Sequence, residues 1–216
     1  IADDDRVVNV LSGQAGWQAP LEVAVEELAR LGQAGLVEAV ALAPYFPDLE
    51  EGPAVEAMRA AIPGGVTEAE YAEIFAALHA EVEAMFAGEG QVGAALAANR
   101  AVAEDLGVPL LGYEGGQHID SWFRPELRPI VTEIQARPEM RDLYLDWLDG
   151  WEAFSGGGLM LPYHLAGNGN DNESFGDLDY VGQQVEEAPK FAAMLDWLGE
   201  DVPEPEPGPE PEPEPV

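Results

Sequence analysis

Apolar and polar residues follow two alternating patterns along the first 199 residues of the chain. Four short apolar runs predict buried strands, and longer segments with apolar positions three and four residues apart predict helices between them. The predicted strands are Arg6–Ser12, Leu36–Phe46, Val108–Glu114 and Gly156–His164. Because a parallel neighbour needs a long crossover, this alternation indicates an α/β fold with parallel strands.

The predicted helices are marked by their ends as well as by their periodicity. Residues 67–88 form the strongest, because Thr67 and Glu70 have the spacing of a capping box and Gly88 follows the last apolar position. A second amphipathic helix has a proline near its start and ends at Gly32. The predicted helices span 19–32, 67–88, 93–107, 137–155 and 189–199.

Two architectures fit these elements. An open doubly wound sheet fits the length, but "LSGQAG" after the first strand lacks the glycine spacing of the phosphate-binding fingerprint. In an eight-fold β/α barrel, the polar residues that follow each strand would all face one rim, where active sites of that fold are built.

Charge and composition narrow the possible partners. The 216 residues include 42 acidic and 9 basic residues, a formal charge of -33, which repels nucleic acid and anionic lipid surfaces. There is no cysteine, and no apolar run is long enough to span a bilayer. We therefore expect no nucleic-acid partner and no membrane insertion. Such acidity is typical of salt-adapted surfaces and equally of a highly soluble secreted protein.

The last residues alternate proline with glutamate. Proline removes amide donors and the glutamates repel one another, so 200–216 is predicted to be an extended, disordered linker after a folded domain at 1–199. Such linkers usually tether a further module or an anchor, and a frayed tail is the alternative.

Residues at or just past the strand ends form a predicted rim of aromatic and polar side chains. Sugars suit such a surface, because their apolar faces stack on rings while their hydroxyls form hydrogen bonds. Any one of these aromatics could instead cap the core. The rim candidates are Gln14, Trp17, Tyr45, Glu114, Gln117, His118, Tyr163 and His164, together with Ser12.

Glu114 stands out, because it is a carboxylate that ends a buried strand. Such a site fixes the orientation and basicity of a carboxylate, as a glycosidase nucleophile requires, although a structural glutamate paired with Arg124 is equally compatible. Gly115 and Gly116 would let the backbone turn tightly and admit a ligand close to the main chain. Tyr45 could donate its hydroxyl to this carboxylate.

Four segments carry a resemblance to a known family: "ALAPYF", "LLGYEGGQH", "LYLDWLDGWEAFSGGGLMLPY" and "APKFAAMLDWL". They resemble the last four strand-helix units of (β/α)8-barrel glycoside hydrolases of the family 5 type clan, and more narrowly secreted relatives labelled cellulose-binding. The resemblance implies a retaining hydrolase of oligo- or polysaccharides. In it, Glu114 matches the nucleophile and Tyr45 the aromatic residue that hydrogen-bonds it.

The resemblance also implies a second glutamate, the acid/base, which follows an asparagine on an earlier strand. The only Asn-Glu pair here is Asn172 and Glu173, in the loop after the fourth predicted strand. We therefore expect this chain to be inactive alone, with the N-terminal half of the barrel as its partner. The family's usual tryptophan platform on the last strand is replaced by Tyr163 or His164.

Other chemistries are weaker. The loop "NGNDNES" is rich in oxygen ligands but lacks the spaced carboxylates of a calcium loop, and His79, His118 and His164 show no metal-site spacing. We expect no metal and no cofactor. Two further functions stay open beside the hydrolase, a non-catalytic carbohydrate-binding barrel and a structural or adhesive surface protein. All three fit a secreted or cell-surface location.

Overall fold

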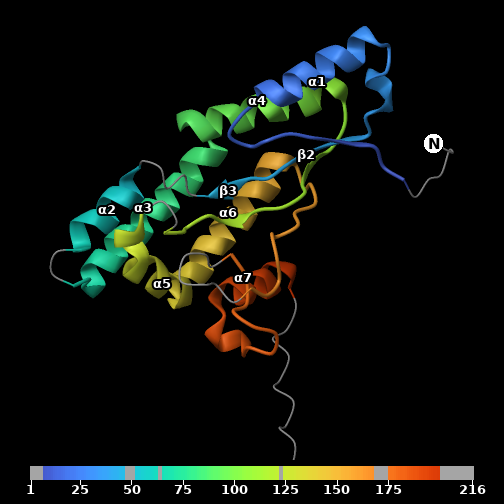
Figure 1. Cartoon of the computed structure of the whole chain (residues 1–216). Coiled ribbons are helices and arrows are strands. Elements are labelled where there is room, and N and C mark those ends of the chain that lie inside the picture. The colour runs from blue at the N-terminus through green and yellow to red at the C-terminus, as the bar shows by residue number, and fades with distance from the viewer. Residues whose placement is uncertain (1–6, 47–51, 63–64, 122–123, 168–174, 200–216) are drawn as a thin grey trace, which may run out of the picture.

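The computed structural model describes residues 7–46, 52–62, 65–121, 124–167 and 175–199. Short strands cross the middle of the molecule, and helices pack along them (Figure 1). Helices α1 (Ala19–Arg30) and α4 (Gly90–Leu106) lie side by side at one end. The predicted linker at 200–216 and the Asn-Glu pair at 172–173 lie outside the described residues.

The strands pair in parallel. In the main sheet, β1 (Val10–Ser12) lies beside β2 (Ala39–Leu42), and β2 lies beside β4 (Leu110–Gly112). A second parallel pair, β3 (Tyr45–Phe46) with β5 (Gly116–Gln117), follows β2 and β4 along the chain. The predicted α/β class with parallel pairing is confirmed.

The strands are shorter than their apolar runs suggest. The predicted strand Leu36–Phe46 is split between β2 and β3, where Pro44 has no amide hydrogen to donate. The predicted strand Gly156–His164 is reduced to a parallel bridge between Met160 and Gly112, because Gly156 and Gly157 have positive φ angles and Pro162 cannot donate. The predicted extents of these two strands were wrong.

The long helices lie close to their predicted positions. The capping box is present at the start of α3 (Glu68–Phe86), where the amide of Thr67 donates to the Glu70 carboxylate over 2.8 Å. Helices α6 (Glu139–Ser155) and α7 (Pro189–Leu198) also match. The sequence pattern does not predict α2 (Pro53–Ala61) or α5 (Arg128–Ala136), which have only nine residues each.

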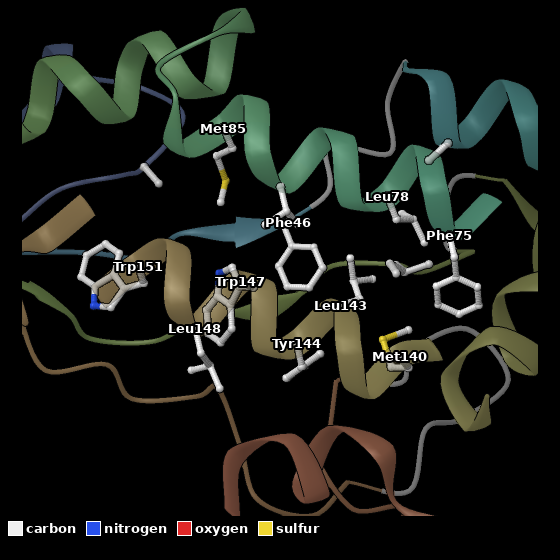
Figure 2. Packing of buried hydrophobic residues seen from close by; sticks show 14 of the residues in the cluster. Phe46, Phe75, Leu78, Met85, Met140, Leu143, Tyr144, Trp147, Leu148 and Trp151 are labelled. Atoms are coloured by element: carbon white, nitrogen blue, oxygen red, sulfur yellow. The ribbon is translucent and has the colours of Figure 1, made fainter. Parts of the chain in front are cut away.

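The core lies between α3, α6 and the strands. Phe46, at the end of β3, packs against Tyr144 and Trp147 of α6 (Figure 2). The buried Trp147 indole N–H donates to the Pro44 carbonyl over 2.9 Å, which ties α6 to the break between β2 and β3. This contact fixes the strand end that carries Tyr45.

Apolar side chains remain exposed at the two outer positions of the sheet. Val10 of β1 is 47% exposed, and Leu159 and Leu161, on either side of the Met160 bridge, are 58% and 49% exposed. The central strand β2 is buried along its whole length. Parallel sheets are normally covered on both faces, so the exposed apolar side chains at the outer strands are sites where further elements could pack.

Among the described residues, no helix is long and apolar enough to cross a membrane.

Candidate functional site

Tyr45 and Glu114 come together where neighbouring strands end. Tyr45 pairs in register with Gly116, two residues after Glu114, and its hydroxyl donates a hydrogen bond to the Glu114 carboxylate. Burial, followed by the negative charge of Glu114, raises the pKa of Tyr45 far above its ordinary value. The phenol therefore stays protonated at neutral pH and remains a donor to this carboxylate.

Aromatic rings lie beside Tyr45. They belong to His118, Tyr163, His164 and Phe175, and together with Tyr45 we call these residues the ring cluster. The Tyr45 ring centroid lies 5.8 Å from that of His118 and 6.1 Å from that of Tyr163. Tyr163 is 48% exposed, so part of the cluster is open to a ligand. Rings of this kind beside a carboxylate suit the faces and hydroxyls of a sugar.

Phe175 joins the ring cluster from a segment in which the sequence pattern indicates only a polar loop. Its ring lies 5.4 Å from that of His118 and 5.8 Å from that of Tyr163, the latter edge to face. Sequence reasoning missed this residue, because a single phenylalanine between a serine and a glycine has no periodicity. Its one signal is that it is the sole large apolar side chain between Ala166 and Leu178.

The two glycines after Glu114 are explained by internal packing. A side chain at Gly115 would lie 2.9 Å from the Trp147 ring, and one at Gly116 would lie 3.1 Å from the Tyr144 hydroxyl. Gly116 also has a φ of +137°, which favours glycine. The space beside these glycines is filled by α6, whereas the sequence pattern suggested room for a ligand. Close packing on α6 thus holds Glu114 at the strand end.

Gln117 lies inside the protein, not on the rim. It is 1% exposed, and its side-chain oxygen accepts hydrogen bonds from the Ile119 amide at 2.7 Å and from Gln135 at 3.2 Å. Its own amide donates to the Tyr144 hydroxyl over 3.2 Å. Because no ligand can reach it in this arrangement, Gln117 braces the turn, and we leave it out of the sugar site.

Gln14 and Trp17 lie at the end of β1, with β2 between them and β4. The Gln14 carbonyl accepts a hydrogen bond from the buried Asn99 side chain at 2.8 Å, which joins this turn to α4. Trp17 is 55% exposed. The two residues form a second part of the rim, away from Glu114.

A hollow of about 380 Å³ lies beside Tyr45. It separates the end of β3 from the facing parts of α3 and α4, and both apolar and polar side chains line it. Phe46, Met85 and Val92 supply the apolar part, and Glu81, Glu89 and Gln91 the polar part. Mixed lining of this kind fits a neutral, hydroxyl-rich ligand better than an anion, because two carboxylates face the space.

The rest of the site gives no sign of a metal. Within the described ranges, no three histidine, aspartate or glutamate side chains come together as ligands.

No family model, curated protein or solved structure matches this chain. The candidate site therefore rests on its own geometry.

Proposed function

We propose that this chain is the C-terminal portion of a (β/α)8-barrel glycoside hydrolase that acts on a neutral oligo- or polysaccharide. One observation carries the proposal: a carboxylate at a strand end, Glu114, accepts a hydrogen bond from Tyr45 inside a partly exposed group of rings. In this proposal Glu114 is the nucleophile. His118, Tyr163, His164 and Phe175 contact the bound sugar, and Trp17 with Gln14 contacts a more distant one.

The chemistry would run in two steps. The Glu114 carboxylate attacks the anomeric carbon as the leaving oxygen departs, which gives a covalent glycosyl-enzyme, and water then releases the sugar with net retention. The Tyr45 hydroxyl holds the attacking carboxylate in one orientation. A second carboxylic acid must protonate the leaving oxygen, and by the resemblance it belongs to the other half of the barrel. The chain alone is therefore expected to be inactive on ordinary glycosides.

The sheet supports the partial barrel. Four strand positions lie side by side in parallel, from β1 through β2 and β4 to the Met160 bridge. Exposed apolar side chains occupy both outer positions, where additional strands of a barrel would lie. The proposed partner is thus the N-terminal half of the same barrel, and the acidic surface suits a highly soluble secreted or cell-surface protein.

A carbohydrate-binding protein without catalysis is the second candidate. It is favoured by the exposure of two rings on the rim, Trp17 and Tyr163, which can stack on sugars whether or not an acid/base is present. In this case, Glu114 only accepts hydrogen bonds from sugar hydroxyls, and replacing it with glutamine leaves affinity almost unchanged. A purely structural surface protein would show no sugar affinity.

Calorimetric titration with neutral β-linked gluco- and manno-hexaoses tests sugar binding. Tyr163→Ala should weaken affinity roughly tenfold, which corresponds to about 1.4 kcal/mol. Tyr180→Ala is the matched control, because Tyr180 is similarly exposed at 58% and lies outside the ring cluster. Equal losses in the two variants, or no binding by the unaltered chain, would contradict a sugar site at the ring cluster.

A further inference from the structure

No sugar contact of the proposed function uses the hollow beside Tyr45. Its volume of about 380 Å³ lies within the range of small-molecule sites, roughly 300–1,000 Å³. The hollow lies where the end of β3 meets the start of α2, the C-terminal half of α3 and the first turn of α4. Regular secondary structure therefore supplies most of its wall.

The walls of the hollow are fixed by close contacts between the helices. A side chain at Gly93 of α4 would lie 2.8 Å from the Met85 carbonyl oxygen and 3.1 Å from that of Ala84, so the backbones of α3 and α4 are in direct contact. The Glu81 carboxylate accepts a hydrogen bond from the Ala54 amide over 2.9 Å, which joins α3 to the first turn of α2. The shape of the hollow is thus set by helix packing before any ligand binds.

The lining combines an apolar face with hydrogen-bonding groups. Phe46 and Met85 are buried, and Met85 points from α3 toward β3 (Figure 2). Glu89 and Gln91, at the start of α4, are exposed and add a carboxylate and an amide. Sugars match both features, because their carbon faces pack on apolar side chains while their hydroxyls donate to carboxylates and accept from amides. The carboxylates of Glu81 and Glu89 disfavour an anionic sugar.

Tyr45 connects this hollow to the rest of the ring cluster. It lines the hollow, its hydroxyl donates to the Glu114 carboxylate, and its ring centroid lies 6.1 Å from that of Tyr163. Ligand groups at the two places would therefore contact the same residue. We infer that the hollow is a second sugar subsite, which holds a neutral unit of the same oligosaccharide beyond the unit at the ring cluster. The inference rests on the proposed function, because it needs a sugar at the ring cluster.

The dependence of affinity on the length of the sugar tests this inference. A disaccharide is expected to occupy the ring cluster, whereas a hexaose reaches the hollow as well. Calorimetric titration of the full chain should therefore give roughly tenfold tighter binding of neutral β-linked hexaoses than of the matching disaccharides. A variant with a filled hollow then shows whether the gain comes from this place.

Ala84→Phe fills the hollow, because Ala84 lines it from α3. This variant should bind the hexaose roughly tenfold more weakly, as it binds the disaccharide, and its affinity for the disaccharide should be unchanged. Ala72→Phe is the matched control, because Ala72 is exposed and lies about three turns earlier in the same helix. Tyr163→Ala, in contrast, should weaken the binding of both sugars.

A second variant keeps the test open if Ala84→Phe does not fold. Gln91 is exposed, so Gln91→Ala leaves the core intact, and the loss of one hydrogen bond should weaken hexaose binding about threefold. Unchanged hexaose affinity in the folded variants, with binding still dependent on Tyr163, would overturn the second subsite alone. Loss of disaccharide binding in Ala84→Phe would also overturn it, because the first sugar would then lie in the hollow. Absence of binding by the unaltered chain, or binding independent of Tyr163, would contradict the proposed function instead.

Discussion

Replacing Trp147 with phenylalanine tests how α6 supports the strand end that carries the candidate site. The indole of Trp147 is fully buried, packs against Phe46 and Tyr144, and donates to the Pro44 carbonyl over 2.9 Å. Trp147→Phe keeps an aromatic ring but removes this donor and part of the ring volume. The Pro44 carbonyl then lies buried without its partner.

The expected loss follows from these two changes. An unsatisfied buried carbonyl costs about 1–3 kcal/mol, and the space left by the smaller ring adds about 1–2 kcal/mol. We expect Trp147→Phe to lower the free energy of unfolding by about 3 kcal/mol. For a domain of this size, that corresponds to a drop in Tm of roughly 6–12 °C.

Urea unfolding followed by far-ultraviolet circular dichroism measures this loss. Trp17→Phe is the matched control, because Trp17 is more than half exposed and its replacement should change the free energy of unfolding by no more than about 0.5 kcal/mol. Equal losses for the two variants, or a loss below about 1 kcal/mol for Trp147→Phe, would refute the assignment of Trp147 as the support of this strand end.

Two further predictions concern local structure. Thr67→Ala should lower the free energy of unfolding by about 1 kcal/mol, because it removes part of the capping box of α3. Hydrogen bonds from Thr67 lower the pKa of Glu70, so the stability from the box is present above the ordinary glutamate pKa and is lost as the pH falls through the lowered value. The cost of Thr67→Ala should therefore shrink in acid, and a cost independent of pH would contradict this. Gly158→Ala should cost about 2–3 kcal/mol in urea unfolding, because the added methyl would lie 1.9 Å from the Leu110 carbonyl oxygen, whereas Gly35→Ala has free space and should be neutral or slightly stabilising.

The sequence predicts the long helices well, because each carries a repeated apolar face and a marked end. The capping box of Thr67 and Glu70 is an example of a signal that is both local and specific. Strand ends are harder to predict. In a buried parallel strand the apolar run continues past the last hydrogen bond, and only the position of Pro44 within its run indicates the break between β2 and β3.

The candidate site is predictable in part. Tyr45 and Glu114 follow neighbouring strands, so their proximity follows from parallel pairing alone. The burial of Gln117 depends on Gln135 and Ile119, whose positions no local pattern gives. The burial of Lys190 and of Asp177 is equally hidden, because lysine and aspartate are usually surface residues.

Covalent trapping of the nucleophile tests the central claim most directly. A dinitrophenyl 2-deoxy-2-fluoro-β-glycoside has a leaving group that needs no protonation, so it reacts with a nucleophile even where the acid/base is absent. The account predicts, by mass spectrometry of peptides, one fluorosugar on Glu114 of the unaltered chain and none in Glu114→Gln. Labelling of a different residue, or no labelling of a chain that binds the matching oligosaccharide, would contradict Glu114 as the nucleophile.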